Sequence, residues 1–125
     1  MLFRKPLLKE FTTYQTLEIV FYNQHKPYRT LLQDVNPLKR NLKKEFIQII
    51  RDRNAFFRFL EVDSLVVGYI YGIIKKVDEN EKGWKSIADL NSLVVLPSYR
   101  KKGYATFMIK EFFSYLRSKN ITYVT

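Results

Sequence analysis

The strongest constraint on the fold is a pair of neighbouring stretches rich in β-branched and aromatic residues, residues 56–62 and 65–77. Only Asp63-Ser64 separates them, and a two-residue polar break between such stretches is typical of a hairpin turn. The pair therefore predicts two antiparallel strands. Gly68 and Gly72 interrupt the second strand, which indicates a bend, a bulge, or close approach by a ligand or another backbone.

Three other stretches have the three- and four-residue apolar spacing of a helix. The first begins with a capping-box pattern from Thr12 to Gln15. The second follows Asn36-Pro37, where a side-chain cap precedes a proline at the first helical position, and the third follows Gly103. The apolar stripes are Leu17, Val20 and Phe21; Leu38, Leu42, Phe46, Ile49 and Ile50; and Ala105, Met108, Ile109, Phe112 and Leu116.

The remaining strands are predicted at residues 3–11, 87–96 and 121–124. Pro6 would confine the first of them to an edge or early position, and residues 78–86 read as a polar loop. The order β-α-α-β-β-β-α-β predicts an α+β, or mixed α/β, domain with a largely antiparallel central sheet and flanking helices. A chain of 125 residues, 46% of them hydrophobic, suits one domain over its whole length.

Composition excludes several kinds of site. The absence of cysteine rules out disulfides, thiolate metal sites and a cysteine nucleophile. His25 is the only histidine, which rules out a multi-histidine metal site, and we expect it at a helix end or on the surface. Neither a signal peptide nor an apolar run long enough to span a membrane is present, so we expect a soluble cytoplasmic protein. The net charge of +10 favours an anionic partner, such as nucleic acid, a phosphorylated cofactor or an acidic membrane surface.

The segment from Arg100 to Ala105 has the features of an anion site. It leads from a strand into a helix, and the first N–H groups of a helix have no partners within it. Arg100, Lys101 and Lys102 add positive charge, while Gly103 and Ala105 are small enough to let a pyrophosphate approach the backbone. The alternative is a solvated basic turn with a glycine at the helix start.

This region resembles the acetyl-CoA signature of the GNAT N-acetyltransferases. Residues 93–97, Leu-Val-Val-Leu-Pro, match its hydrophobic-x-Val-x-Pro strand end, and residues 100–105, Arg-Lys-Lys-Gly-Tyr-Ala, match Arg/Gln-x-x-Gly-x-Gly/Ala. Val67-Gly68 and the order of elements extend the resemblance over roughly the whole chain. It implies that residues 100–106 wrap the pyrophosphate of acetyl-CoA and that backbone groups near Leu93 and Val95 pair with the pantetheine arm. The implied cofactor-binding residues are Leu93, Val95, Arg100, Lys101, Lys102, Gly103, Tyr104, Ala105 and Thr106.

The resemblance also implies a reaction, the transfer of an acetyl group to a primary amine of a small molecule or protein by direct attack in a ternary complex. An alkylammonium with a pKa near about 10.4 must first lose a proton, so a base or a water relay is needed. The candidate base is Asp89, because the family often places a carboxylate near this height. Asp89 and Asn91 alternate with Leu93 and Val95 and share a face with them until any bulge intervenes.

Other assignments compete for these carboxylates. Asp89 could instead bond a neighbouring strand end or loop, and Glu61 and Glu79 are weaker candidates for the base. The acceptor itself is not readable from the sequence. The excess of positive charge favours an anionic acceptor, or serves only the cofactor.

The chain departs from the family at its C-terminal end. Family members usually continue past the fifth strand into a helix and two more strands, and that helix often supplies a tyrosine that protonates the leaving thiolate. Tyr123 comes too early for this role, and Tyr104 belongs to the pyrophosphate turn. We expect the domain to lack these last elements, by truncation, as a naturally short or decayed member, or as a protomer completed by a partner. An unpaired final strand would be an exposed edge, which predicts self-association there.

Two rival functions belong to other classes. Residues 102–107 look like the core of an RNA-recognition motif, although that core must lie on a strand and Thr106 stands where it has an aromatic residue. The helical spacing that follows argues against RNA binding. The second rival is a non-catalytic member that binds acetyl-CoA and reports it to a partner protein.

Overall fold

The computed structural model describes residues 1–25, 40–78, 84–122 and 124. Its elements are β1 (Leu2–Arg4), the 3₁₀ turn η1 (Leu8–Glu10), α1 (Phe11–His25), α2 (Leu42–Arg51), β2 (Ala55–Val62), β3 (Leu65–Asp78), β4 (Trp84–Val95), the 3₁₀ turn η6 (Pro97–Tyr99) and α3 (Tyr104–Ser118).

The predicted hairpin is the centre of the sheet. β2 pairs antiparallel with β3 up to the Val62 and Leu65 pair, and both turn residues have positive φ angles, 51° at Asp63 and 66° at Ser64. Two such residues in succession give the turn a twist that matches the strands. The four strands lie in the order β1-β2-β3-β4, with every neighbouring pair antiparallel. The predicted α+β class is confirmed.

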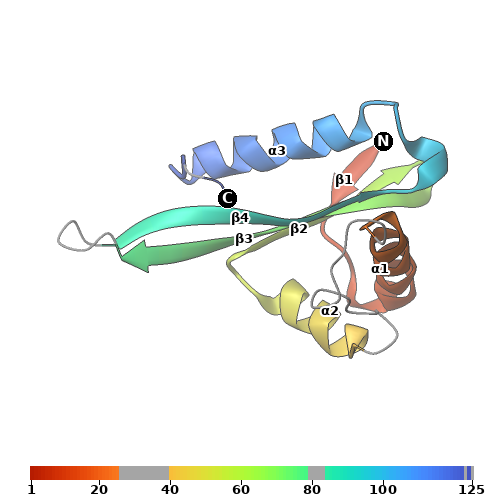
Figure 1. The fold of residues 1–125 in the computed structure, drawn as a ribbon, viewed down its shortest axis with the longest axis horizontal. Coiled ribbons are helices and arrows are strands. Elements are labelled where there is room, and N and C mark those ends of the chain that lie inside the picture. The colour runs from red at the N-terminus through yellow and green to blue at the C-terminus, as the bar shows by residue number, and fades with distance from the viewer. Residues whose placement is uncertain (26–39, 79–83, 123, 125) are drawn as a thin grey trace.

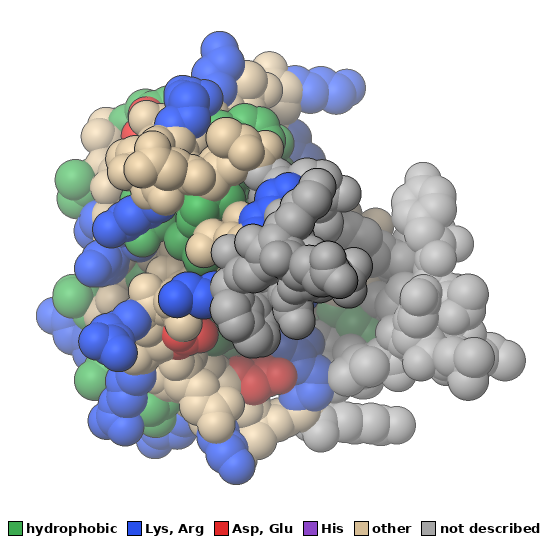
Figure 2. Space-filling view, turned by 90° about the vertical axis from the view of Figure 1, so that its left-hand side faces the viewer, with side chains coloured by type: hydrophobic (Ala, Val, Ile, Leu, Met, Phe, Trp, Pro, Cys, Tyr) green, Lys and Arg blue, Asp and Glu red, His purple; other side chains and the backbone are tan. Residues whose placement is uncertain are grey.

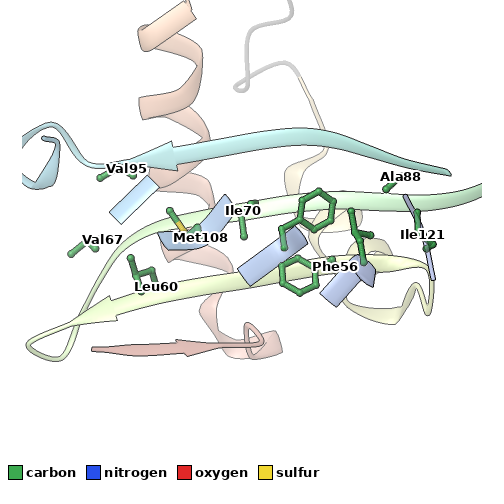
Figure 3. Packing of buried hydrophobic residues seen from close by; sticks show 10 residues of the cluster. Phe56, Leu60, Val67, Ile70, Ala88, Val95, Met108 and Ile121 are labelled. Atoms are coloured by element: carbon green, nitrogen blue, oxygen red, sulfur yellow. The ribbon is translucent and has the colours of Figure 1, made fainter. Parts of the chain in front are cut away.

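Helices cover both faces of the sheet (Figure 1): α3 lies along one face, and α1 and α2 lie on the other. Each face therefore has its own apolar core. Between the sheet and α3 lie Phe56, Leu60, Val67, Ile70, Ala88, Val95, Met108, Phe112, Leu116 and Ile121, most of them labelled in Figure 3. Against α1 and α2 lie Tyr14, Leu17, Leu42, Phe46, Phe57, Phe59, Tyr69 and Val94.

The two glycines of β3 have the close neighbours that the sequence predicts. A Cβ at Gly68 would overlap the carbonyl oxygen of Val94 on β4, and its next contact would be the Val94 carbonyl carbon at 3.2 Å. A Cβ at Gly72 would lie 2.5 Å from the Phe112 ring. The β3–β4 register also shifts between Tyr71 and Gly72, which confirms a bulge at this position.

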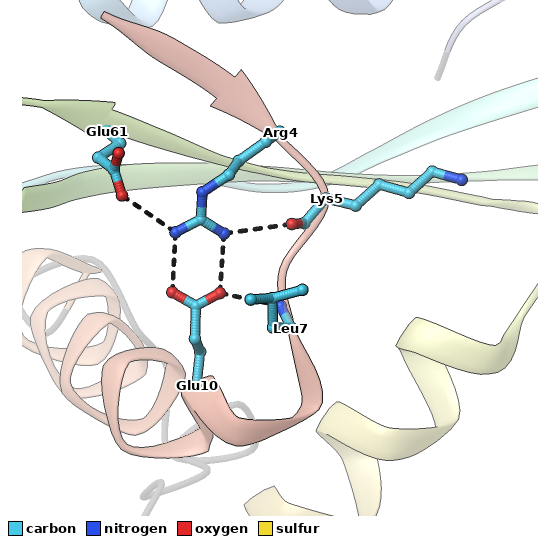
Figure 4. A network of polar contacts seen from close by, with 5 residues as sticks. All are labelled: Arg4, Lys5, Leu7, Glu10 and Glu61. Carbon is cyan, nitrogen blue, oxygen red and sulfur yellow. Dashed lines mark hydrogen bonds and ion pairs between the residues drawn. The ribbon is translucent and has the colours of Figure 1, made fainter. Parts of the chain in front are cut away.

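The N-terminal segment differs from the prediction. Its strand ends at Arg4, and the chain turns through η1 directly into α1, so Thr12 lies inside the helix and the predicted capping box is wrong. Glu10 closes the turn by accepting the Leu7 N–H at 2.9 Å. Arg4 then donates to both Glu10 oxygens at 2.8 and 2.9 Å and to Glu61 at 3.1 Å, as Figure 4 shows. This network fastens η1 to β1 and β2, and β1 does lie at the edge of the sheet.

The second helix begins later than predicted. Asn41 caps α2 by accepting the Lys44 N–H at 3.1 Å, and Arg40 lies in a bend, so no continuous helix runs from Asn36-Pro37. Residues 26–39 themselves lie outside the described part. Asn41 directly precedes Leu42, which is buried together with Phe46, so the cap lies next to these residues of the apolar stripe.

The last strands also shift. β4 begins at Trp84, three residues before its predicted start and inside the expected loop, of which residues 79–83 lie outside the described part. Of the predicted strand at 121–124, the described residues contain a single parallel bridge between Val124 and Ala88 of β4. Ile121 is buried under the end of α3 instead.

The surface reflects the excess of basic residues. On the face shown in Figure 2, Lys and Arg side chains cover much of the described surface, while acidic side chains form only small patches. Among the described helices, none is both long enough and apolar enough to cross a membrane.

Candidate functional site

The chain leaves β4 at Val95, passes through η6 and enters α3 at a glycine with left-handed backbone. Gly103 is the N-cap, with φ 84° and ψ 4°, and no side chain caps the helix in its place. Lys101 also has a positive φ of 63°. These two positions turn the backbone into α3, and the first N–H groups of a helix have no partners within it, as an anion site requires.

A cleft of about 200 Å³ lies at this helix start. Its lining includes most of the predicted cofactor-binding residues: Val95, Arg100, Lys101, Gly103, Tyr104, Ala105 and Thr106. Leu93 and Lys102 are not part of the lining. Tyr99 lines the cleft although the sequence reasoning missed it; its ring lies 6.4 Å from that of Tyr104 and 5.3 Å from the Lys102 ammonium nitrogen. The sequence signal that could have identified Tyr99 is its position between Pro97 and Arg100 of the matched signature.

Arg100 positions the turn as well as charging it. Its Nε donates to the Val95 carbonyl at 3.0 Å, and a terminal nitrogen donates to the Gln24 side chain of α1 at 3.0 Å. A guanidinium has five N–H donors, so these two bonds leave others available to an anion in the cleft. Arg100 thereby links the end of β4, the cleft and α1.

The edge of β4 beside the cleft faces away from β3. Leu96 donates its N–H to the Val67 carbonyl of β3 at 2.7 Å, and backbone groups alternate in direction along a strand. The backbone groups of Val95 and Leu93 therefore point to the outer edge, and the bond from Arg100 reaches Val95 from that side. Within the described residues, the only strand-type bridge on this outer edge joins Ala88 to Val124.

A bulge in β4 separates the residues that were expected to share a face. Tyr71 is paired with Ser92 and Gly72 with Leu90, so Asn91 is the extra residue. Leu93 and Val95 pack toward α3, whereas Asn91 and Ser92 line a cavity on the side of α1 and α2. The bulge thus breaks the alternation on which the shared face depended.

The candidate bases lie in different places. Asp89 is paired with Ile73 across the strands and forms an ion pair with Lys75, leaving its side chain 23% exposed. Glu61 belongs to the Arg4 network at the opposite edge of the sheet, so it does not meet the other candidates. Glu79 lies outside the described residues. His25 is the last residue of α1, at the helix end where it was expected.

The cavity at the bulge has a volume of about 520 Å³, and the sequence did not reveal it. Four elements, together with one residue before α2 and one after it, supply its walls: Tyr14, Glu18, Arg40, Glu45, Gln48, Ile49, Asp52, Tyr71, Asn91 and Ser92. The signal that could have revealed it is Glu18, which directly follows Leu17 of the apolar stripe and is only 4% exposed. A carboxylate in such a position requires partners.

Those partners form a chain of polar contacts along the cavity wall. Glu18 accepts a short hydrogen bond from the Tyr69 hydroxyl and pairs with Arg40 at 3.0 Å. Arg40 in turn pairs with Glu45 at 2.7 Å. Burial, reinforced by the nearby Glu18 carboxylate, raises the pKa of Tyr69 well above its ordinary value, so it remains a donor at neutral pH.

The sequence matches the acetyltransferase (GNAT) family over residues 14–125, which covers most of the chain. The chain belongs to the GNAT N-acetyltransferase family. No curated protein sequence matches it significantly. The GNAT signature predicted from residues 93–105 therefore identified the family correctly.

Solved structures share the GNAT fold at low sequence identity. An acetyltransferase from Vibrio fischeri has a TM-score of 0.79 at 14% identity, with 99% of this chain and 93% of that one covered. A ribosomal-protein-alanine N-acetyltransferase from Brucella melitensis has a TM-score of 0.69 at 14% identity and coverage of 100% and 78%. An aminoglycoside N-acetyltransferase in complex with CoA has a TM-score of 0.73 at 14% identity and coverage of 99% and 74%.

The structure of residues 104–118 bears on the RNA-binding alternative. Residues 104–118 form α3, so the segment that looks like an RNA-recognition core enters a helix instead of a strand. Its aromatic residues cannot line a sheet surface in that conformation.

Proposed function

We propose that this chain transfers an acetyl group from acetyl-CoA to a primary amine of a small molecule or protein, by direct attack in a ternary complex. One observation carries the proposal: β4 connects the cleft at the start of α3 to the cavity at the bulge. From Asn91 to Val95 the strand spans roughly 13 Å. An extended ligand along this edge would place its anionic part at one end and its reactive part at the other.

The cleft residues fit a pyrophosphate. The N–H groups of Tyr104, Ala105 and Thr106 begin α3, where the helix dipole favours negative charge. Gly103 keeps the approach open, since a Cβ there would meet nothing within 4 Å. Lys101 and the donors that remain on Arg100 would complete the contacts, and the outward backbone groups of Val95 and Leu93 would pair with the pantetheine amides.

The bound cofactor would supply an electrophilic thioester carbonyl, at which the amine forms a C–N bond while the C–S bond breaks and coenzyme A leaves as a thiolate. The residues at the bulge would hold the acceptor beside that carbonyl, with the amide of Asn91 and the hydroxyl of Ser92 on the strand side. The ammonium of the acceptor must lose its proton before it attacks.

Asp89 stays our candidate for the group that takes this proton, directly or through water. Asp89→Asn should lower the acetylation rate while leaving acetyl-CoA affinity nearly unchanged. Lys75→Gln is the matched control, because it breaks the same ion pair and keeps the carboxylate. Unchanged turnover of Asp89→Asn across pH would contradict the assignment, and so would an equal loss in both variants.

The proposed function is tested by calorimetric titration with acetyl-CoA, followed by a turnover screen against a library of amines. Binding with transfer to at least one amine supports the enzyme. Binding without transfer to any amine supports the alternative of a non-catalytic module that senses acetyl-CoA. The absence of acetyl-CoA binding, with RNA affinity that falls steeply as salt rises, would overturn both.

Self-association is a separate proposal, and it concerns the C-terminal strand predicted at residues 121–124. Strand edges with unpaired backbone groups tend to recruit another chain, and the described residues of this segment have one bridge, between Val124 and Ala88 of β4. Sedimentation across a range of concentrations should show a dimer or a larger species. A monomer at every concentration would contradict the proposal.

A further inference from the structure

The charge inside the bulge cavity is opposite to that of the chain. The chain has a net charge of +10, yet the described charged residues that line the cavity are three carboxylates, Glu18, Glu45 and Asp52, and one guanidinium, Arg40. Arg40 contacts Glu18 and Glu45 together, so one positive charge is shared between two negative ones. The cavity wall is therefore short of positive charge, by two in formal terms.

Asp52 contributes the least neutralised of these carboxylates. It accepts the Asn54 N–H at 2.8 Å, and no lysine or arginine of the described chain forms an ion pair with it. Burial, and next the charge of the Asp52 carboxylate, raise the pKa of Tyr71, so this charge acts on another residue that lines the cavity. Asp52 thus presents an available anionic group opposite the bulge.

A second, independent feature is the hydroxyl of Tyr14. Its residue is 3% exposed and lines the cavity, and its ring is fixed by stacking on Phe46 at a centroid distance of 5.0 Å. No residue of the described chain forms a hydrogen bond with this hydroxyl, although a buried hydroxyl normally has a partner. Burial, followed by the Glu18 carboxylate, raises the pKa of Tyr14, so the group stays protonated and its oxygen can accept from an N–H donor.

We propose that the acceptor is a di- or polycationic amine. Its second ammonium group binds Asp52 and Glu45, while the Tyr14 hydroxyl accepts a hydrogen bond from an N–H group of the acceptor. This inference rests on the proposed acetyltransferase function and adds its substrate class. The volume of about 520 Å³ lies within the usual range for small-molecule sites. The net charge of the chain alone would favour an anionic acceptor, but local charge decides what a cavity holds.

Three amines with four-carbon chains test the proposal. Besides the amine that reacts, 1,4-diaminobutane carries a second cation, 1-aminobutane carries no second charge, and 4-aminobutanoate carries an anion. We expect kcat/KM to fall in that order. Asp52→Asn should lower kcat/KM for the diamine by about fivefold, the order expected for one partly exposed ion pair, and leave 1-aminobutane nearly unchanged. Asparagine keeps the oxygen that accepts the Asn54 N–H, so the turn should survive the change.

Asp63→Asn is the matched control, since it removes the same charge from the exposed β2–β3 turn at a residue with positive φ that asparagine tolerates. It should leave all three rates unchanged. The proposal is overturned if the diamine is no better than 1-aminobutane, if 4-aminobutanoate is preferred, or if Asp52→Asn affects all three amines equally.

A binding measurement separates this inference from the proposed function. The diamine is titrated calorimetrically into the protein saturated with coenzyme A, with and without Asp52→Asn. Diamine binding that depends on Asp52, without turnover, would reject catalysis and support the binding site for cationic amines. Turnover of an amine without preference for the diamine would keep the enzyme and reject the site.

Discussion

Gly68→Ala tests how closely β3 and β4 approach each other at Gly68. This spacing sets the position of the outer edge of β4. The new methyl group would overlap the Val94 carbonyl oxygen, which belongs to the backbone and cannot rotate away. To restore carbon contacts of about 3.5–4 Å, the strands must separate locally by roughly 1 Å. The adjoining bond from Leu96 to Val67, now 2.7 Å, would then exceed hydrogen-bonding distance.

The free energy of this change follows from three effects. Overpacking costs about 1–3 kcal/mol, and a lost backbone hydrogen bond costs about 0.5–1.5 kcal/mol. Alanine also restricts the unfolded chain, which returns about 0.4–1 kcal/mol. The net loss is about 2 kcal/mol, which lowers the Tm of a domain of this size by about 6–12 °C.

Thermal and urea denaturation of Gly68→Ala measure this loss directly. Gly103→Ala is the comparison: its Cβ would enter open space, so its cost comes only from the positive φ of 84° and should be nearer 1 kcal/mol. If Gly68→Ala is as stable as the wild type, or less harmful than Gly103→Ala, β3 and β4 do not approach each other this closely at Gly68.

Two further predictions concern stability. Hydrogen bonds from Arg4 lower the pKa of Glu10. The ionised Glu10 carboxylate therefore contributes its full stability above the unfolded-state pKa of about 4.3, and this contribution is lost as pH falls through the lower pKa of the folded state. Glu10→Gln should make thermal stability less sensitive to acid between pH 7 and 3, and equal acid sensitivity of variant and wild type would contradict this. Phe112 is fully buried against the sheet, so Phe112→Ala should cost about 3–5 kcal/mol in urea denaturation, and an unchanged midpoint would refute its place in the core.

The parts of the fold that sequence predicted well are those with strong local signals. The hairpin around Asp63-Ser64 and the helix after Gly103 combine apolar period with turn chemistry, and both lie close to their predicted bounds. Helix starts were less secure, because Thr12 and Asn36 have the same capping chemistry as Asn41. Asn41, which caps α2, directly precedes Leu42 of the stripe that packs against the sheet, and that packing depends on the folded chain.

The candidate site divides in the same way. The cleft at residues 99–106 is contiguous in sequence, so its residue types and spacing could be recognised. The bulge cavity joins residues of α1, α2, β3 and β4. Neither the extra residue Asn91 nor the lack of a hydrogen-bond partner for the Tyr14 hydroxyl among the described residues can be seen without the folded chain. One inserted residue in β4 also moved Asp89 off the face that a regular strand would give it.

The central claim, that the start of α3 holds the pyrophosphate of acetyl-CoA, is tested most directly by calorimetric titration of Thr106→Glu. Thr106 is exposed and lines the cleft; an acid in the first turn of a helix favours its stability but would repel a pyrophosphate. Ser114→Glu places the same charge on an exposed position about 12 Å further along α3. We predict that Thr106→Glu weakens acetyl-CoA binding at least about tenfold, or about 1.4 kcal/mol, while Ser114→Glu binds like the wild type. Equal affinity of Thr106→Glu and wild type would contradict the claim.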